Sequence, residues 1–157
     1  MELGYDFDGT YSSPVQDFSI SRISSTTQNV YSSWGSLRNL VFTPRGGCRE
    51  QLSSGDEALW AFDPVAPGRT MLDISPQVIV VNPAETSSIV LTVTQVNPNN
   101  GNRSPASGAT LGDTDLSDAN GNIQLRVPSQ PGCYQYKAEM TNAIRSPAVY
   151  LTVTESL

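Results

Sequence analysis

The sequence predicts a mainly β protein, built of a small β-rich module followed by a larger β-sandwich. The first observation is composition: the 157 residues include 12 glycines and 11 prolines, and only 15% are charged. The second is a series of short, alternating apolar segments after residue 70. Abundant turn formers with few charges indicate short strands joined by tight turns, because long exposed helices depend on Glu–Lys pairs.

The first module, residues 1–63, is predicted from short amphipathic segments. Residues 17–23 alternate, with Phe18 and Ile20 on one face and serines on the other. Before it, Asp6 and Asp8 lie on one side of an early strand that we expect to end in an Asp8–Gly9 turn. The other elements are two short strands and a polar segment that is a loop or a short helix: 37–42, 57–62 and 24–33.

A linker at 64–69, with two prolines and a glycine, separates this module from residues 70–157. In the second module Asn100-Gly101 and Asn120-Gly121 supply hairpin turns. About seven short strands in roughly 85 residues is the spacing of an immunoglobulin-like (Ig-like) sandwich. The predicted strands are 70–74, 77–81, 87–96, 109–111, 122–127, 133–140 and 147–154.

Composition also limits the function. The net charge of −6, with nine basic residues that form no cluster, argues against binding to nucleic acid or to anionic lipid. The chain has no histidine, which removes the usual general base and the commonest zinc ligand. No apolar run approaches the roughly 20 residues of a membrane helix. We therefore expect no membrane insertion, no cofactor and no enzymatic activity.

Four motifs between residues 107 and 154 resemble the Ig-like repeats of bacterial and fungal surface proteins. They are Ser107-Gly-Ala-Thr-Leu-Gly, Asp118-Ala-Asn-Gly-Asn-Ile, Pro131-Gly-Cys-Tyr-Gln-Tyr and Ile144-Arg-Ser-Pro-Ala-Val-Tyr. The resemblance implies an extracellular or cell-surface protein used in adhesion, in wall association or as a spacer. The amino terminus lacks the regions of a secretory signal, which leaves a cytosolic protein or a fragment of a longer secreted precursor. Composition and the resemblance favour the fragment.

Residues 30–63 resemble the carboxy-terminal domain of transcobalamin, a small β-grasp-like module. The residues that carry the resemblance are Trp34-Gly35, Gly47-Cys48, Leu52, Gly55-Asp56-Glu57 and Leu59-Trp60. Residues 1–29 do not match the start of that module, so the first domain is either incomplete or diverged. The resemblance implies a small, flat, tetrapyrrole-like ligand, bound together with a partner domain that this chain lacks.

Aromatic side chains are concentrated in the first 62 residues, and Tyr31, Trp34 and Trp60 are the candidates for a ligand groove. Such a groove predicts binding of a small flat molecule or a glycan, whereas the alternative is that the rings fill a small core. The leading expectation remains a non-enzymatic surface module whose partner is a glycan, a protein or a small flat ligand.

The two cysteines, Cys48 and Cys133, lie one in each module. Tyr134 and Tyr136 form the apolar face of their strand, so Cys133 points away from the core. We expect a Cys48–Cys133 disulfide, because an exposed free thiol is a liability in an oxidising compartment. Two separate free thiols are the alternative.

Three further candidates have simpler structural alternatives. Asp113, Asp115 and Asp118 are a weak calcium candidate, because carboxylates in one loop can bind hard cations, but a solvated turn explains them as well. Asn102 opens an Asn-Arg-Ser glycosylation sequon. Asp56 and Glu57 point to opposite faces of a strand entrance and so predict a turn, not an acid–base pair.

Overall fold

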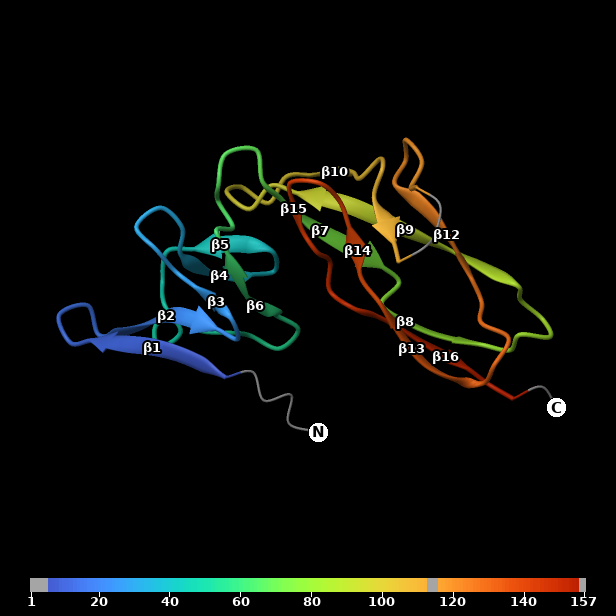
Figure 1. The fold of residues 1–157 in the computed structure, drawn as a ribbon, viewed down its shortest axis with the longest axis horizontal. Helices are drawn as coiled ribbons and strands as arrows, with labels where there is room; N and C mark the ends of the chain where they lie inside the picture. Colours follow the sequence, from blue (N-terminus) through green and yellow to red (C-terminus); the bar gives the residue numbers. More distant parts are fainter. Residues whose placement is uncertain (1–5, 113–115, 156–157) are drawn as a thin grey trace. The chain divides into compact units, whose positions relative to one another are not determined.

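The computed structural model describes residues 6–112 and 116–155, and this part of the chain is all β, with no helix. The chain divides into two compact units: residues 1–67 with 98–101, and residues 68–97 with 102–157 (Figure 1). The boundary after residue 67 falls inside the segment expected as a linker. No helix in the described ranges is long and apolar enough to cross a membrane.

The first unit begins with a three-stranded antiparallel sheet of β1 (Phe7–Ser12), β2 (Asp17–Ile23) and β3 (Thr26–Thr27). The expected Asp8–Gly9 turn is wrong, because these residues form a bulge inside β1. Ahead of the bulge, Arg22 of β2 pairs with Asp6 at 3.0 Å and with Asp8 at 2.6 Å. The 24–33 segment contains β3 and no helix.

A second antiparallel sheet in this unit has the order β5-β4-β6, from Val41–Thr43, Trp34–Arg38 and Ala58–Phe62. The single strand predicted at 37–42 is wrong. Asn39 and Leu40 have positive φ values of 53° and 67°, so the chain reverses there and forms a hairpin. The buried residues of the unit include Leu37, Leu40 and Ala61, and Phe42 donates its N–H to the Pro98 carbonyl at 2.7 Å.

The second unit contains a sheet ordered β10-β9-β7-β15, in which β12 also pairs with β9. A second sheet has the order β13-β16-β8, with β16 and β8 parallel, and a short ladder joins β11 to β14. The strands of the first sheet are β7 (Thr70–Ser75), β9 (Ser88–Val96), β10 (Arg103–Pro105), β12 (Asn122–Arg126) and β15 (Ala143–Ile144). The others are β8 (Val78–Val81), β11 (Thr110–Leu111), β13 (Gly132–Tyr136), β14 (Ala138–Glu139) and β16 (Val149–Val153).

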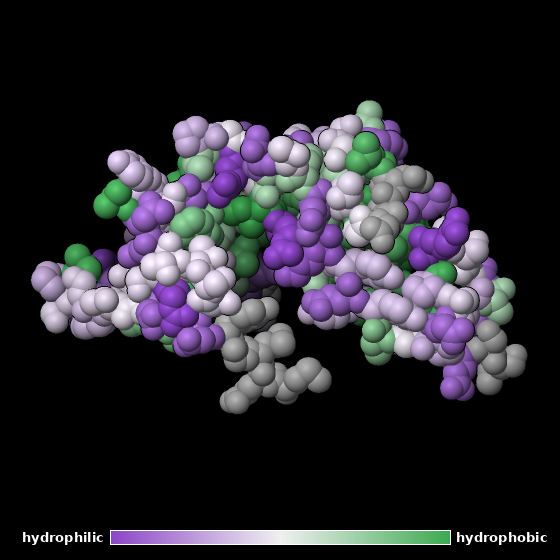
Figure 2. All heavy atoms as spheres, in the orientation of Figure 1, coloured by the Kyte–Doolittle hydropathy of each residue, from purple (hydrophilic) through white to green (hydrophobic). Residues whose placement is uncertain are grey.

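One hydrophobic cluster joins strands of both sheets in this unit. The alternation read from the sequence is confirmed, since Leu91, Ile123 and Leu151 are buried while their neighbours Val90 and Tyr150 are exposed. Gly101 and Gly121 have φ values of 74° and 80°, as the Asn-Gly turns require. Hydrophilic residues cover most of the visible face in Figure 2, and hydrophobic ones show in small groups.

Candidate functional site

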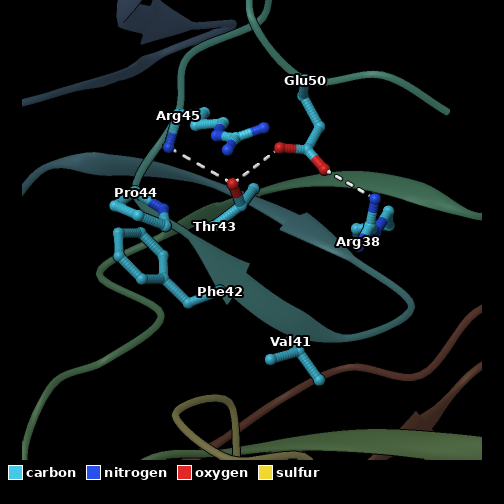
Figure 3. Close-up of a pocket in the computed structure, with 7 residues that line it drawn as sticks. All are labelled: Arg38, Val41, Phe42, Thr43, Pro44, Arg45 and Glu50. Atoms are coloured by element: carbon cyan, nitrogen blue, oxygen red, sulfur yellow. Dashed lines mark hydrogen bonds and ion pairs between the residues drawn. The ribbon is translucent and has the colours of Figure 1, made fainter.

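A shallow pocket with a volume of about 260 Å³ lies in the first unit, at the β4–β5 hairpin and the loop that follows it (Figure 3). The hairpin and the loop together line it, with polar side chains dominant. The lining residues are Arg38, Val41, Phe42, Thr43, Pro44, Arg45 and Glu50.

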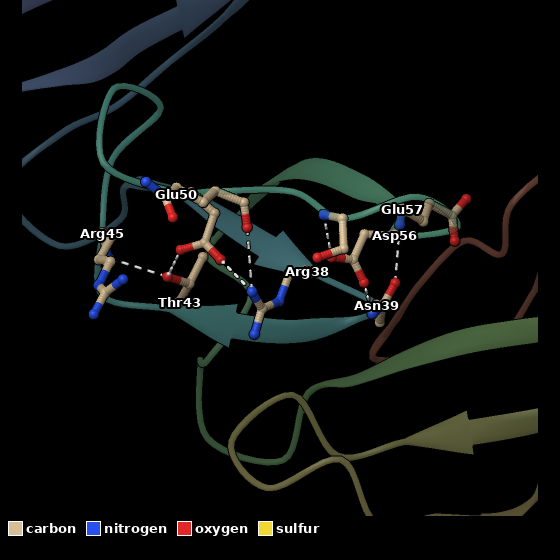
Figure 4. Close-up of polar contacts among 9 residues, drawn as sticks. Arg38, Asn39, Thr43, Arg45, Glu50, Asp56 and Glu57 are labelled. Carbon is tan, nitrogen blue, oxygen red and sulfur yellow. Dashed lines mark hydrogen bonds and ion pairs between the residues drawn. The ribbon is translucent and has the colours of Figure 1, made fainter.

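The hairpin turn at Asn39-Leu40 lies between Arg38 and Val41, which both line the pocket. Asn39 tolerates a positive φ, and its side chain donates to Asp56 Oδ1 at 2.7 Å and accepts the Glu57 N–H at 2.9 Å (Figure 4). Asp56 also accepts the Ser53 N–H, and these bonds hold its pKa below the usual 3.8, most of all the bond from Ser53. Asp56 is therefore a turn residue, as the sequence predicts.

A polar network forms the floor of the pocket. Thr43 donates its hydroxyl to Glu50 Oε2 at 2.8 Å and accepts the backbone N–H of Arg45 at 3.2 Å. Arg38 Nη1 lies 3.2 Å from Glu50 Oε1 and donates to the Gln51 carbonyl at 3.3 Å. The Glu50 side chain is only 12% exposed, compared with 49% for Arg38. The carboxylate is thus largely covered and already has its partners.

The pocket has a net positive charge. Two guanidinium groups, of Arg38 and Arg45, stand on either side of the Thr43–Glu50 pair. Within the described residues, the Arg45 side chain has no hydrogen bond or ion pair, and Arg38 shares one carboxylate. The positive charge of Arg45 is therefore not balanced within the pocket, although the chain as a whole has a net charge of −6. The guanidinium fork suits a carboxylate or sulfate group, which it can bind in bidentate fashion.

Sequence reasoning did not single out these pocket residues. In the sequence, Arg38 and Thr43 each follow an apolar residue, Leu37 and Phe42, which is typical of polar positions on a strand. This pattern does not indicate that Glu50, from a separate loop, lies between them. Only the path of the loop after β5 brings the three side chains together.

The structure separates the three aromatic candidates. Trp34 and Trp60 lie on one face of the β5-β4-β6 sheet, since Trp34 pairs with Phe62 and Ser36 pairs with Trp60. The Trp34 ring packs edge-on against the Phe62 ring, with the two ring centroids 5.3 Å apart. The Trp34 Nε1–H donates to the Thr26 carbonyl at 3.2 Å. Tyr31 is 92% exposed in the preceding loop. None of the three lines the pocket.

Cys48 and Cys133 are both exposed free thiols, one in each unit, and the described residues contain no disulfide. The outward direction of Cys133 is confirmed, because Ala138 on the same chain segment is buried while Cys133 and Gln135 are exposed. The disulfide itself stays a prediction.

The acidic candidates for calcium divide between described and undescribed residues. Asp113 and Asp115 lie outside the described residues. Asp118 accepts the N–H groups of Asn120 and Asn122, each at 2.8 Å, and these bonds keep its pKa below the usual 3.8, that from Asn122 most strongly. Asp118 is therefore the acceptor of the turn that leads into β12. The hairpin expected at Asn120-Gly121 is wrong, because β12 pairs with β9 and not with the strand before it. Among the described residues no three His, Cys, Asp or Glu side chains cluster as metal ligands would.

The glycosylation candidate Asn102 is exposed immediately before β10, and its carbonyl accepts the Asn97 N–H at 2.8 Å. No protein-family model, no curated protein and no solved structure matches this chain.

Proposed function

We propose that the chain is a non-enzymatic extracellular or cell-surface module, in which an Ig-like sandwich serves as scaffold for adhesion, wall association or spacing. The observation that carries the proposal is the strand order of the second unit. There β9 pairs with β7 and β12, while β16 pairs with β13 and β8.

Strand pairing supports the Ig-like assignment. An Ig sandwich places strands A, B and E in one sheet and strands C, F and G in the other. Assigning β7, β9 and β12 to A, B and E, and β13 and β16 to F and G, accounts for both ladders. β14 continues strand F after β13, and β11 takes the place of strand C. The pairing of β11 with β14 is then the contact expected between strands C and F.

A relationship of the first unit to the transcobalamin domain is part of the same proposal. The residues that carry the resemblance lie together in space: Gly35 pairs with Ala61 beside Trp60, and the Trp60 ring lies 3.5 Å from where a Cβ on Gly47 would be. Sequence positions separated by more than ten residues thus form one sheet and its covering loop.

Protease treatment of intact producing cells tests the surface location. The protein is expected to be digested while a cytosolic marker survives. Protection equal to that of the marker would overturn the proposal, and so would turnover of a substrate by the purified chain.

A second candidate function is ligand binding at the pocket of the first unit, and the leftover charge of Arg45 favours it. The volume of about 260 Å³ lies below the roughly 300–1,000 Å³ of common small-molecule sites. A single acidic sugar unit therefore suits the pocket better than a large, flat tetrapyrrole. Arg45 and the N–H groups of Arg38 would hold the carboxylate or sulfate of such a glycan.

Titration calorimetry with a uronate oligosaccharide, a sulfated one and their neutral counterpart tests this second function. The acidic ligands are expected to bind, with affinity that falls as salt rises. Arg45→Gln should weaken binding about tenfold, whereas the control Arg126→Gln, at an exposed residue that ends β12, should leave it unchanged. Equal binding of the neutral oligosaccharide, or equal losses in both variants, would contradict the assignment.

A further inference from the structure

The peptide bond between Asp63 and Pro64, just after β6, has an unusual backbone setting. It is the only Asp-Pro bond in the sequence. Asp63 has a φ of 56°, in the left-handed region, whereas the residue before a proline ordinarily adopts an extended conformation with negative φ. Backbone strain of this kind is concentrated at functional sites. The bond is therefore a candidate for chemistry.

Hydrogen bonds within the first unit hold Asp63 in this conformation. Its N–H donates to the Ser33 carbonyl at 2.8 Å, and its Oδ2 accepts the Ser32 hydroxyl at 3.2 Å. Its carbonyl oxygen accepts the Ala66 N–H at 3.3 Å, which closes a turn around Pro64. The backbone, the carboxylate and the carbonyl of Asp63 are thus each oriented by a neighbour.

The other side of the bond is fixed by packing. Pro64 is buried, and its Cγ lies 2.6 Å from where a Cβ on Gly35 would be. The Pro64 ring therefore rests directly on the backbone of β4. Its nitrogen belongs to a tertiary amide, which accepts a proton and leaves as an amine more readily than the nitrogen of an ordinary peptide bond.

These contacts favour attack by the Asp63 carboxylate on the carbonyl carbon of the same residue. The attack closes a five-membered ring, and because both groups belong to one residue it needs no encounter with a second molecule. Negative charge develops on the carbonyl oxygen, where the Ala66 N–H stabilises it. The Ser32 hydroxyl positions the carboxylate.

We propose that the folded chain cleaves its own Asp63–Pro64 bond in a single turnover. A carboxylate oxygen of Asp63 bonds to the carbonyl carbon, and the bond from that carbon to the Pro64 nitrogen breaks. The electron pair stays on the nitrogen, which takes up a proton from solvent and becomes a secondary amine. The product at Asp63 is a cyclic anhydride. One water molecule opens it, leaving Asp63 with two carboxyl groups, so the net reaction is hydrolysis and needs no cofactor.

The position of the bond gives this cleavage a consequence for the architecture. Among the described residues, the strands of the first unit, β1 to β6, end at Phe62, and those of the second unit begin with β7 at Thr70. Cleavage after Asp63 therefore cuts no strand. It separates the covalent chain of the two modules and leaves the hydrogen-bonded ladders of both intact.

Intact mass of the purified full chain, incubated at pH 5, tests the proposal. Acid supplies the proton for the leaving nitrogen, and reductant prevents a Cys48–Cys133 disulfide from holding the products together. Fragments 1–63 and 64–157 should appear, with masses that sum to the chain plus one water. The same chain unfolded in urea should be cleaved at least about tenfold more slowly, because the positioning contacts are lost. Added hydroxylamine should give a fragment 1–63 that ends in a hydroxamate, because it intercepts the anhydride.

Matched variants test the individual groups. Asp63→Gly tolerates the positive φ but has no carboxylate, so cleavage should be lost. Ser32→Ala should slow cleavage about tenfold, and Ser32→Thr, which keeps a hydroxyl, should restore it. The control Ser33→Ala changes an exposed side chain and keeps the carbonyl that accepts the Asp63 N–H, so its rate should stay that of the unchanged chain.

Four results would overturn the proposal. They are a folded chain that stays intact, equal rates in the folded and urea-unfolded chains, cleavage that persists in Asp63→Gly, and fragments that form without any hydroxamate in hydroxylamine. Equal rates for Ser32→Ala and Ser33→Ala would overturn the positioning role of Ser32.

Discussion

Asp17 holds Gly46 by a hydrogen bond of 2.6 Å from the Gly46 N–H to Oδ2, across 29 positions of the sequence. Oδ1 accepts the N–H of Cys48 at 3.2 Å and that of Phe18 at 2.9 Å. The carboxylate therefore ties β2 to the loop that carries Cys48 and, two residues later, Glu50 of the pocket. Asp17, which lies outside the β5-β4-β6 sheet, thus holds the loop from which Glu50 lines the pocket.

Asp17→Ala should destabilise the first unit, because three backbone N–H groups lose their acceptor. Both tryptophans of the chain, Trp34 and Trp60, lie in this unit, so thermal unfolding followed by tryptophan fluorescence reports on it selectively. The fluorescence midpoint should fall. The control Asp118→Ala removes a similar turn acceptor in the second unit and should leave the fluorescence midpoint in place. Equal midpoints for Asp17→Ala and the unchanged chain would contradict the role of Asp17.

Acid should destabilise the first unit through Asp17. Desolvation raises the pKa of this carboxyl, but the bonds from Gly46, Phe18 and Cys48 together lower it more, so the folded-state pKa lies below the ordinary 3.8. A lowered folded-state pKa adds stability that is complete above 3.8 and is lost as the pH falls through the folded-state value. Fluorescence-detected urea unfolding between pH 7 and pH 2 should give midpoints that drop at the acid end. In Asp17→Ala this drop should be smaller, and an identical drop in both proteins would assign it to other carboxyls.

Two adjacent glycines should respond differently to the same substitution. A methyl group at Gly46 would meet the Phe18 carbonyl oxygen and, at 2.5 Å, Oδ1 of Asp17, whereas at Gly47 the nearest atom, in the Trp60 ring, is 3.5 Å away. Gly46→Ala should therefore cost about 1–3 kcal/mol of unfolding free energy, as overpacking does, and Gly47→Ala should cost little. Urea titration of both variants measures the difference, and equal costs would show that the loop is not held against β2.

The cysteines give a prediction about the whole chain. Protein purified from an oxidising compartment should carry a Cys48–Cys133 disulfide, contain no thiol that alkylates before reduction, and lose about 4 kcal/mol at most on reduction. Intact mass with and without reductant and alkylating agent measures this. Alkylation of both thiols without reductant would show that they are the free, exposed groups of the structure.

The strands could be predicted from sequence where one face is buried and the pattern has period two. This is why β2, β9, β12 and β16 lie where the alternation puts them. Prediction failed at Asn39-Leu40 because Leu40, at 2% exposure, continues an apolar pattern while its backbone reverses direction. The prediction of a turn failed at Asp8–Gly9 because β-bulges and turns favour the same residue types.

By itself, the sequence determined the all-β character, the turns at Gly101 and Gly121, and the outward direction of Cys133, because each depends on local backbone preference or on side-chain alternation. Only the tertiary structure decided that Arg38, Thr43 and Glu50 form one network, that Asp17 holds Gly46, and that β8 ends its sheet. These relationships join residues that are far apart in the chain, and which strands and loops become neighbours depends on packing of the whole unit, which local patterns do not encode.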